Sequence, residues 1–139
     1  MKRREFLKKA GCGAAGFTVI PMAQASNDEK GELILRRYDI EVEVVEVGPK
    51  TRCHKVGEKF KWPLEMGKLC HWLGSALDPV VTSLAGGAIY PWRYKGTAYE
   101  KVIDPEGVTT EFIRCPDPTE AGIVVRITRT FKEKRVLKG

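Results

Sequence analysis

The sequence predicts an α+β domain, a small antiparallel sheet of about four strands with a two-helix insertion packed on one face. Residues 37–47 alternate apolar and acidic side chains, as a strand with one solvated face does. Apolar residues recur at spacings of three and four over 69–84, which is typical of one helix face. Alternation returns at 122–131. The order strand, strand, helices, strand, strand indicates helices covering one face of an antiparallel sheet.

The first 25 residues have the three parts of an export signal. The basic start MKRREFLKK precedes a mildly apolar run, AGCGAAGFTVI, which is too short to span a bilayer as a stable helix. The paired arginines resemble the twin-arginine export motif, and AQA is a pattern that signal peptidase accepts. The residues that carry this signal are Arg3, Arg4, Phe6, Leu7, Ala23 and Ala25. We therefore expect a periplasmic or other extracytoplasmic protein whose export partners are the twin-arginine translocase and signal peptidase.

The charge of the chain is concentrated in this signal. The formal net charge is +6, but five of the 24 basic residues and one of the 18 acidic residues lie in the first 25 positions, which leaves +2 for the remainder. No lysine-rich stripe with interleaved aromatics remains, so nucleic-acid binding is not expected. We expect a signal at 1–25, a polar linker at 26–33 and one small domain at 34–139, with no membrane span after cleavage.

The first half of this domain begins with two predicted strands. The alternating strand at 37–47 ends at Gly48-Pro49, and a second short strand is expected at 55–62, with Gly57 at a turn or bulge. A loop bounded by Pro63 and Gly67 follows, and the hydrophobic period then changes from two to that of a helix.

Two short helices are expected next, at 68–77 and 79–85, because Asp78-Pro79 resembles a helix cap followed by a first-turn proline. Gly86-Gly87 ends the second helix, and the aromatic segment AIYPWRYKGTAY is expected to lie across the core. Further strands are expected at 109–115 and 122–131.

Several short motifs resemble those of a widespread family of small, uncharacterised bacterial and archaeal proteins. They are a cysteine before a G-x-x-F turn at 57–60, a G-x-x-C-x-W helix start at 67–72, L-x-G-G at 84–87, P-W at 91–92 and C-P-D at 115–117. The similarity runs from about Tyr38 to Thr130. It implies this fold and the positions of three cysteines, and it implies no established reaction.

The three cysteines of the expected mature chain each lie at the edge of a predicted element. Cys53 precedes the second strand, Cys70 lies in the first turn of a helix, and Cys115 ends the third strand. If these edges converge, three thiolates and the imidazole of His54 or His71 form a Cys₃His set suited to zinc, iron or an iron–sulfur cluster. Their spacing resembles no CxxC knuckle, so spacing alone is a weak metal signal.

Other interpretations of the cysteines remain open. In an oxidising compartment two of them can form a structural disulfide and leave a spare thiol. They can also pack as small apolar residues or exchange disulfides with a redox partner protein. A thiol enzyme with Cys70 as its nucleophile is a further alternative. Without a GxSxG, HExxH, GxGxxG or Walker motif, the sequence favours a binding or accessory module over an enzyme.

Aromatic side chains provide a second candidate site. Trp72, Tyr90 and Trp92 are candidates to line a ligand pocket, although helix spacing also explains Trp72 as core and Pro91-Trp92 as a cover over it. Asp78 and Asp117 are interpreted as cap and turn residues. The two functional predictions are therefore a metal-binding or redox accessory module that acts through its cysteines, and a disulfide-stabilised binding domain without a cofactor.

Overall fold

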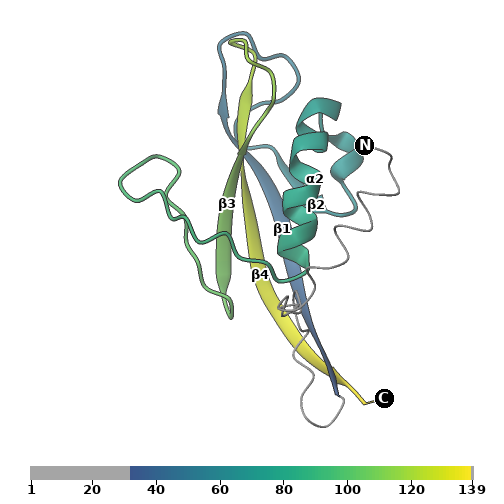
Figure 1. The fold of residues 1–139 in the computed structure, drawn as a ribbon. Coiled ribbons are helices and arrows are strands. Elements are labelled where there is room, and N and C mark those ends of the chain that lie inside the picture. The colour runs from purple at the N-terminus through teal and green to yellow at the C-terminus, as the bar shows by residue number, and fades with distance from the viewer. Residues whose placement is uncertain (1–31, 139) are drawn as a thin grey trace, which may run out of the picture.

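The computed structural model describes residues 32–138, and the predicted export signal lies outside them. Its elements are β1 (Leu33–Val47), β2 (Lys59–Trp62), the 3-10 helix η2 (Met66–Lys68), α2 (His71–Ala85), β3 (Val108–Arg114) and β4 (Ile123–Leu137). The strands form one antiparallel sheet in the order β2-β1-β4-β3, and α2 covers one face (Figure 1). The predicted α+β class and the four-stranded antiparallel sheet are confirmed.

Strands β1 and β4 form the long spine of the sheet. The apolar residues of the alternating segment, Ile40, Val42 and Val44, are at most 3% exposed and face α2. Val42 lies opposite Ile127, and Val44 lies opposite Val125, so the two strands bury their apolar faces together. This is the core that the period-2 pattern predicted.

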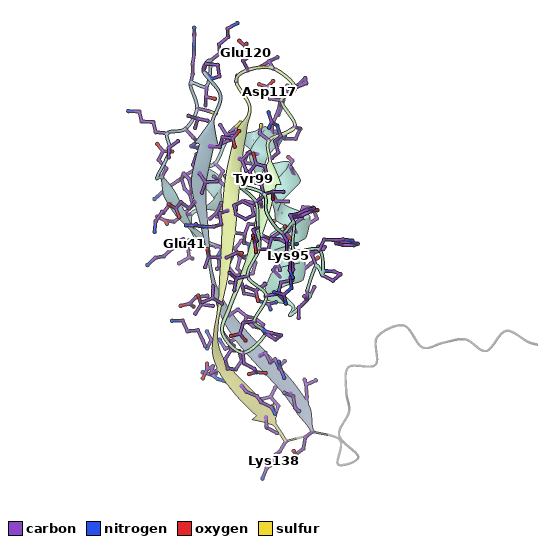
Figure 2. All side chains as sticks on the ribbon, turned by 90° about the vertical axis from the view of Figure 1, so that its left-hand side faces the viewer. Glu41, Lys95, Tyr99, Asp117, Glu120 and Lys138 are labelled. Atoms are coloured by element: carbon purple, nitrogen blue, oxygen red, sulfur yellow. The ribbon has the colours of Figure 1, made fainter. Side chains whose placement is uncertain are left out.

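Both spine strands are longer than predicted. Beyond the core they continue as a two-stranded arm, in which residues 33–37 pair with residues 133–137. The arm has the C-terminal end of β4 at its tip, where Figure 2 labels Lys138. Most side chains here are exposed, including Leu33 and Leu35. Because neither face is fully buried, the arm lacks the apolar-polar alternation on which the prediction depended.

The predicted break at Asp78-Pro79 does not occur, and α2 is one continuous helix of 15 residues with Pro79 inside it. Its buried residues, Leu73, Leu77, Val81 and Leu84, follow one face and pack on the sheet. Proline costs a helix interior one backbone hydrogen bond. Burial of each leucine or valine is worth about 1.5–3 kcal/mol, so packing of an unbroken apolar face outweighs that loss.

Strand β2 is shorter than predicted. Residues 54–58 form a turn instead, with Gly57 at φ 91° and the side chain of Val56 59% exposed. The positive φ of Gly57 lets its N–H donate to the carbonyl of Val44 at 2.8 Å. The strand proper places the buried ring of Phe60 opposite Val42.

A segment without regular structure, residues 86–107, connects α2 to β3 and extends outward beside β3 (Figure 1). It is anchored to the sheet by Lys101, which is 4% exposed and whose Nζ donates to Glu111 Oε2 at 2.6 Å. The prediction that its aromatic residues cover the core is wrong for Trp92, which is 63% exposed. A buried ion pair rather than an aromatic cover therefore holds this segment in place.

Candidate thiol site

One end of the sheet is formed by three segments that are distant in sequence. They are the β1–β2 loop at 48–58, the start of α2, and the β3–β4 turn at 115–122, and we call this the thiol end. Gly48 N–H donates to the Gly122 carbonyl at 2.9 Å, and Lys50 N–H donates to the Glu120 carbonyl at 3.1 Å. A Cβ on Gly48 would lie 1.9 Å from the Glu120 carbonyl oxygen, so only glycine permits this approach. The loop that carries Cys53 is thereby held against the turn that begins at Cys115.

His54 joins the same loop to the start of α2. The backbone N–H of Cys70, the cap residue of the helix, donates to His54 Nε2 at 3.0 Å. Since Nε2 accepts this bond, Nδ1 carries the proton and donates to Glu58 Oε2 at 2.9 Å. The ring is 8% exposed and packs edge-on against Phe60, with 5.5 Å between ring centroids.

These contacts change the interpretation of the two histidines. Both ring nitrogens of His54 are hydrogen-bonded, so in this arrangement the residue is a clamp between loop and helix with no nitrogen left for a metal. His71 is exposed at the first position of α2, and its ring makes no hydrogen bond within residues 32–138. Neither imidazole therefore lies ready to complete the predicted Cys₃His set.

The structure places the three predicted cysteines in the three segments of the thiol end. Cys115 is buried, Cys70 is half-buried and Cys53 is exposed, and none is in a disulfide. Partial burial raises the pKa of the Cys53 thiol, and nearby negative charge on Cys70 or Cys115 raises it further. Electrostatic effects of this kind act between groups that lie close together.

The thiols are neighbours without being a preformed metal site. Within residues 32–138, no group of three or more histidine, cysteine, aspartate or glutamate side chains has the geometry to hold a metal ion. Each cysteine side chain turns about a single side-chain torsion, which adopts one of three staggered positions. Binding of an ion by all three sulfurs would therefore require rotation of thiols within the cluster.

The aromatic candidates do not form a shared site. Trp72 is 57% exposed on α2, so its predicted place in the core is wrong, and the apolar face of the helix continues without it. Tyr90 is half-buried, and its backbone carbonyl accepts a hydrogen bond from Lys101 Nζ at 3.2 Å. Helical spacing alone did not distinguish Trp72, at the edge of the apolar stripe, from Leu73 at its centre.

The structure also shows functional candidates that sequence reasoning missed. A concave site on the other face of the sheet contains Tyr94, Tyr99, Phe112 and Arg114. Phe112 and Arg114 are two residues apart in β3, and this spacing is the one signal in the sequence that places them on the same face. The contribution of residues 94–99 depends on how an irregular segment folds back, which no period reveals.

The export residues Arg3, Arg4, Phe6, Leu7, Ala23 and Ala25 lie outside the described residues, so the predicted signal stays a prediction. Within residues 32–138, no helix is both long enough and apolar enough to cross a membrane. Comparisons of the chain with known protein families, with curated proteins and with solved structures find no match. The family resemblance drawn from the motifs therefore stays a prediction. The thiol end and the pocket with Tyr99 are the features of the structure that bear on function.

Proposed function

We propose that this protein is an exported accessory module that binds a thiophilic metal ion through Cys53, Cys70 and Cys115. The observation that carries this proposal is the convergence of three thiols from three separate elements at the thiol end. A structural disulfide uses two cysteines, whereas a site for a soft metal ion gives the third one a role.

The surroundings of the cluster favour a donor set made of sulfur alone. The nitrogens of His54 are engaged with Cys70 and Glu58, and the carboxylate of Glu58 is engaged in turn with His54. Three thiolates without hard oxygen ligands suit ions such as Cu(I) or Zn²⁺, and zinc would take a fourth ligand from water or a partner. Burial and, after it, repulsion between thiolates raise the pKa of Cys53, and a bound cation would offset that repulsion.

The test measures metal and thiols in the same sample. The domain is produced without its signal and purified anaerobically, and bound copper, zinc and iron are counted by elemental mass spectrometry beside a titration of free thiols. We expect close to one ion per chain, and loss of that ion in each of Cys53→Ser, Cys70→Ser and Cys115→Ser. His71→Ala is the matched control, and it should retain the ion if the donor set is sulfur alone.

A preparation that binds none of these ions after incubation with each would contradict the proposal. Retention of the ion by any one of the three serine variants would exclude that cysteine as a ligand. Loss of the ion in His71→Ala would leave a metal site in place but overturn the sulfur-only donor set.

A second candidate function is thiol–disulfide exchange between Cys53 and Cys70. It is favoured by the electrostatic effect of Cys70, which after burial is the next cause that raises the pKa of Cys53. In this reaction the two thiols become one disulfide, while two electrons and two protons reduce the disulfide of a partner protein to two thiols. Exposure to a glutathione redox buffer would lower the thiol count from three to one, and Cys115→Ser would leave that exchange intact.

A further inference from the structure

A pocket lies on the face of the sheet opposite α2, away from the side that the helix covers. Figure 2 looks onto this face, with the helix behind the strands and Tyr99 lying over them. The pocket has a volume of about 420 Å³, which is within the range of small-molecule sites. Its lining residues are Tyr94, Thr97, Ala98, Tyr99, Phe112, Ile113, Arg114 and Val124.

The wall of the pocket that comes from residues 93–101 is held in a defined shape. Lys101 N–H donates to the Arg93 carbonyl at 2.9 Å and closes the segment into a loop. Inside it, the hydroxyl of Thr97 donates to the Tyr94 carbonyl at 2.7 Å, where Tyr94 has the left-handed φ of 49°. The buried ion pair of Lys101 with Glu111 fixes the base of the loop on β3. The loop therefore does not have to be ordered by a ligand.

Tyr99 extends from this loop across three strands. Its ring packs edge-on against Phe112 of β3, with 5.6 Å between centroids, and its hydroxyl donates to Glu46 Oε2 of β1 at 2.6 Å. The hydrogen bond to Glu46 raises the pKa of Tyr99, which keeps the hydroxyl protonated as a donor. The ring thus lies over the row in which Val124 of β4 pairs with Glu46 on one side and Arg114 on the other.

Arg114 is the one charged residue among those that line the pocket, and the carboxylate of Glu46 lies beside it at the hydroxyl of Tyr99. Arg114 is exposed, and within residues 32–138 its side chain makes neither an ion pair nor a hydrogen bond to protein. Arg126, which lies opposite Phe112 on the neighbouring strand, is by contrast paired with Glu43. The pocket therefore combines aromatic walls with a guanidinium that is available to an anion.

We propose that this pocket binds a small planar aromatic acid. Its ring would pack among Tyr94, Tyr99 and Phe112, and its carboxylate or sulfonate would pair with the guanidinium of Arg114. An apolar wall alone would bind any apolar molecule, whereas the unpaired guanidinium of Arg114 at its edge favours an anionic one. This pocket is separate from the thiols, so binding of an aromatic acid here does not depend on binding of a metal ion by the cysteines.

The test uses 8-anilino-1-naphthalenesulfonate, an aromatic sulfonate with a planar naphthalene ring, titrated by calorimetry and fluorescence into the signal-free domain at low ionic strength. We expect saturable binding of one probe per chain. Arg114→Gln should weaken it about tenfold, the loss of one charge-assisted hydrogen bond. Phe112→Leu should weaken it roughly threefold to tenfold by removing one aromatic wall. Arg52→Gln, an exposed arginine outside the pocket, is the matched control and should leave it unchanged.

A neutral probe with the same rings, N-phenyl-1-naphthylamine, separates charge recognition from apolar adsorption. Its binding should be weakened by Phe112→Leu and left unchanged by Arg114→Gln. The proposal is overturned if the sulfonate shows no saturable one-to-one binding. It is also overturned if Arg114→Gln and Arg52→Gln have equal effects while thermal unfolding shows that both variants fold.

Discussion

At the scale of single residues, His54 connects two segments of the fold, whereas His71 does not. It is buried, it accepts the N–H of Cys70 and it donates to Glu58, so one ring connects the β1–β2 loop to the start of α2. His71 is adjacent to Cys70 in sequence and exposed. The position of Cys53 beside Cys70 therefore depends on His54 and not on His71.

Replacement of His54 by alanine should destabilise the domain by roughly 2–4 kcal/mol. The change leaves the Cys70 N–H without its acceptor, which costs about 1–3 kcal/mol, and opens a space beside Phe60. Urea denaturation followed by tryptophan fluorescence measures the difference. His71→Ala is the control and should stay within about 0.5 kcal/mol of the wild type. Equal stability of the two variants would show that the clamp contributes nothing.

The partner of His54 predicts a dependence on pH. The hydrogen bond from His54 lowers the pKa of Glu58 below its ordinary value of 4.5, with smaller effects from Lys55. A carboxylate whose pKa is lower in the folded state stabilises the fold above its unfolded pKa, and this stabilisation is lost as pH falls through the folded pKa. Glu58→Gln should therefore flatten the fall in stability below about pH 4.5, measured by urea denaturation at successive pH values. Parallel curves for wild type and variant would contradict this.

At the scale of elements, Arg129 fixes the end of α2 to the sheet. It lies at an inward-facing position of β4, 1% exposed, and its Nη1 donates to the carbonyls of Leu84 and Ala88 at 3.0 and 2.9 Å. Its guanidinium also lies over the ring of Tyr38, 4.4 Å from the centroid. Burial lowers the pKa of Arg129, but a guanidinium remains charged in proteins. The positive charge thus lies at the negative end of the helix dipole.

Replacement of Arg129 by alanine should cost about 3–5 kcal/mol, because it removes two hydrogen bonds and leaves a cavity between α2 and β4. The Ala88 carbonyl loses its donor, whereas the Leu84 carbonyl still accepts the N–H of Gly87 at 3.0 Å. Chemical denaturation monitored by circular dichroism gives the value. Arg93→Ala removes an exposed arginine whose side chain makes no hydrogen bond within residues 32–138, and it should be close to neutral. A loss below about 1 kcal/mol for Arg129→Ala would show that the buried charge is as costly as its contacts are favourable.

At the scale of the whole molecule, periodic patterns in the sequence predict the helix and strands, but they do not predict how these elements pack together. Alternation identified the two spine strands and helical spacing identified α2, because both depend on local period. Helix-cap rules predicted a break at Pro79, and helical spacing placed Trp72 in the core, because neither rule includes the sheet against which α2 packs. Alternation through Ile127 also places Arg129 on the inner face, a signal of a buried charge whose partners the sequence does not name.

The candidate sites also contain features that the sequence predicts and features that depend on tertiary contacts. The placement of the three cysteines at one end of the sheet was predictable because each lies at an element edge, and antiparallel pairing brings such edges to the same end. Whether their sulfurs share a metal ion stays a prediction. The hydrogen bond from Cys70 to His54, and the pocket under Tyr99, depend on contacts between residues more than 15 positions apart. Such contacts follow from tertiary structure and leave no periodic trace in the chain.

The ion pair of Lys101 with Glu111 connects the stability of the whole fold to the shape of the pocket, because it ties residues 86–107 to β3. Lys101→Met should lower the free energy of unfolding by roughly 3–5 kcal/mol, because it leaves the buried carboxylate of Glu111 without its cation. The double variant Lys101→Met with Glu111→Met should recover much of this stability. Recovery will be incomplete because Glu111 Oε1 also accepts the N–H of Phe112. Urea denaturation of both variants measures this, with the exposed Lys95→Met as control. A double variant less stable than Lys101→Met would show that the pair is favourable even against apolar replacements.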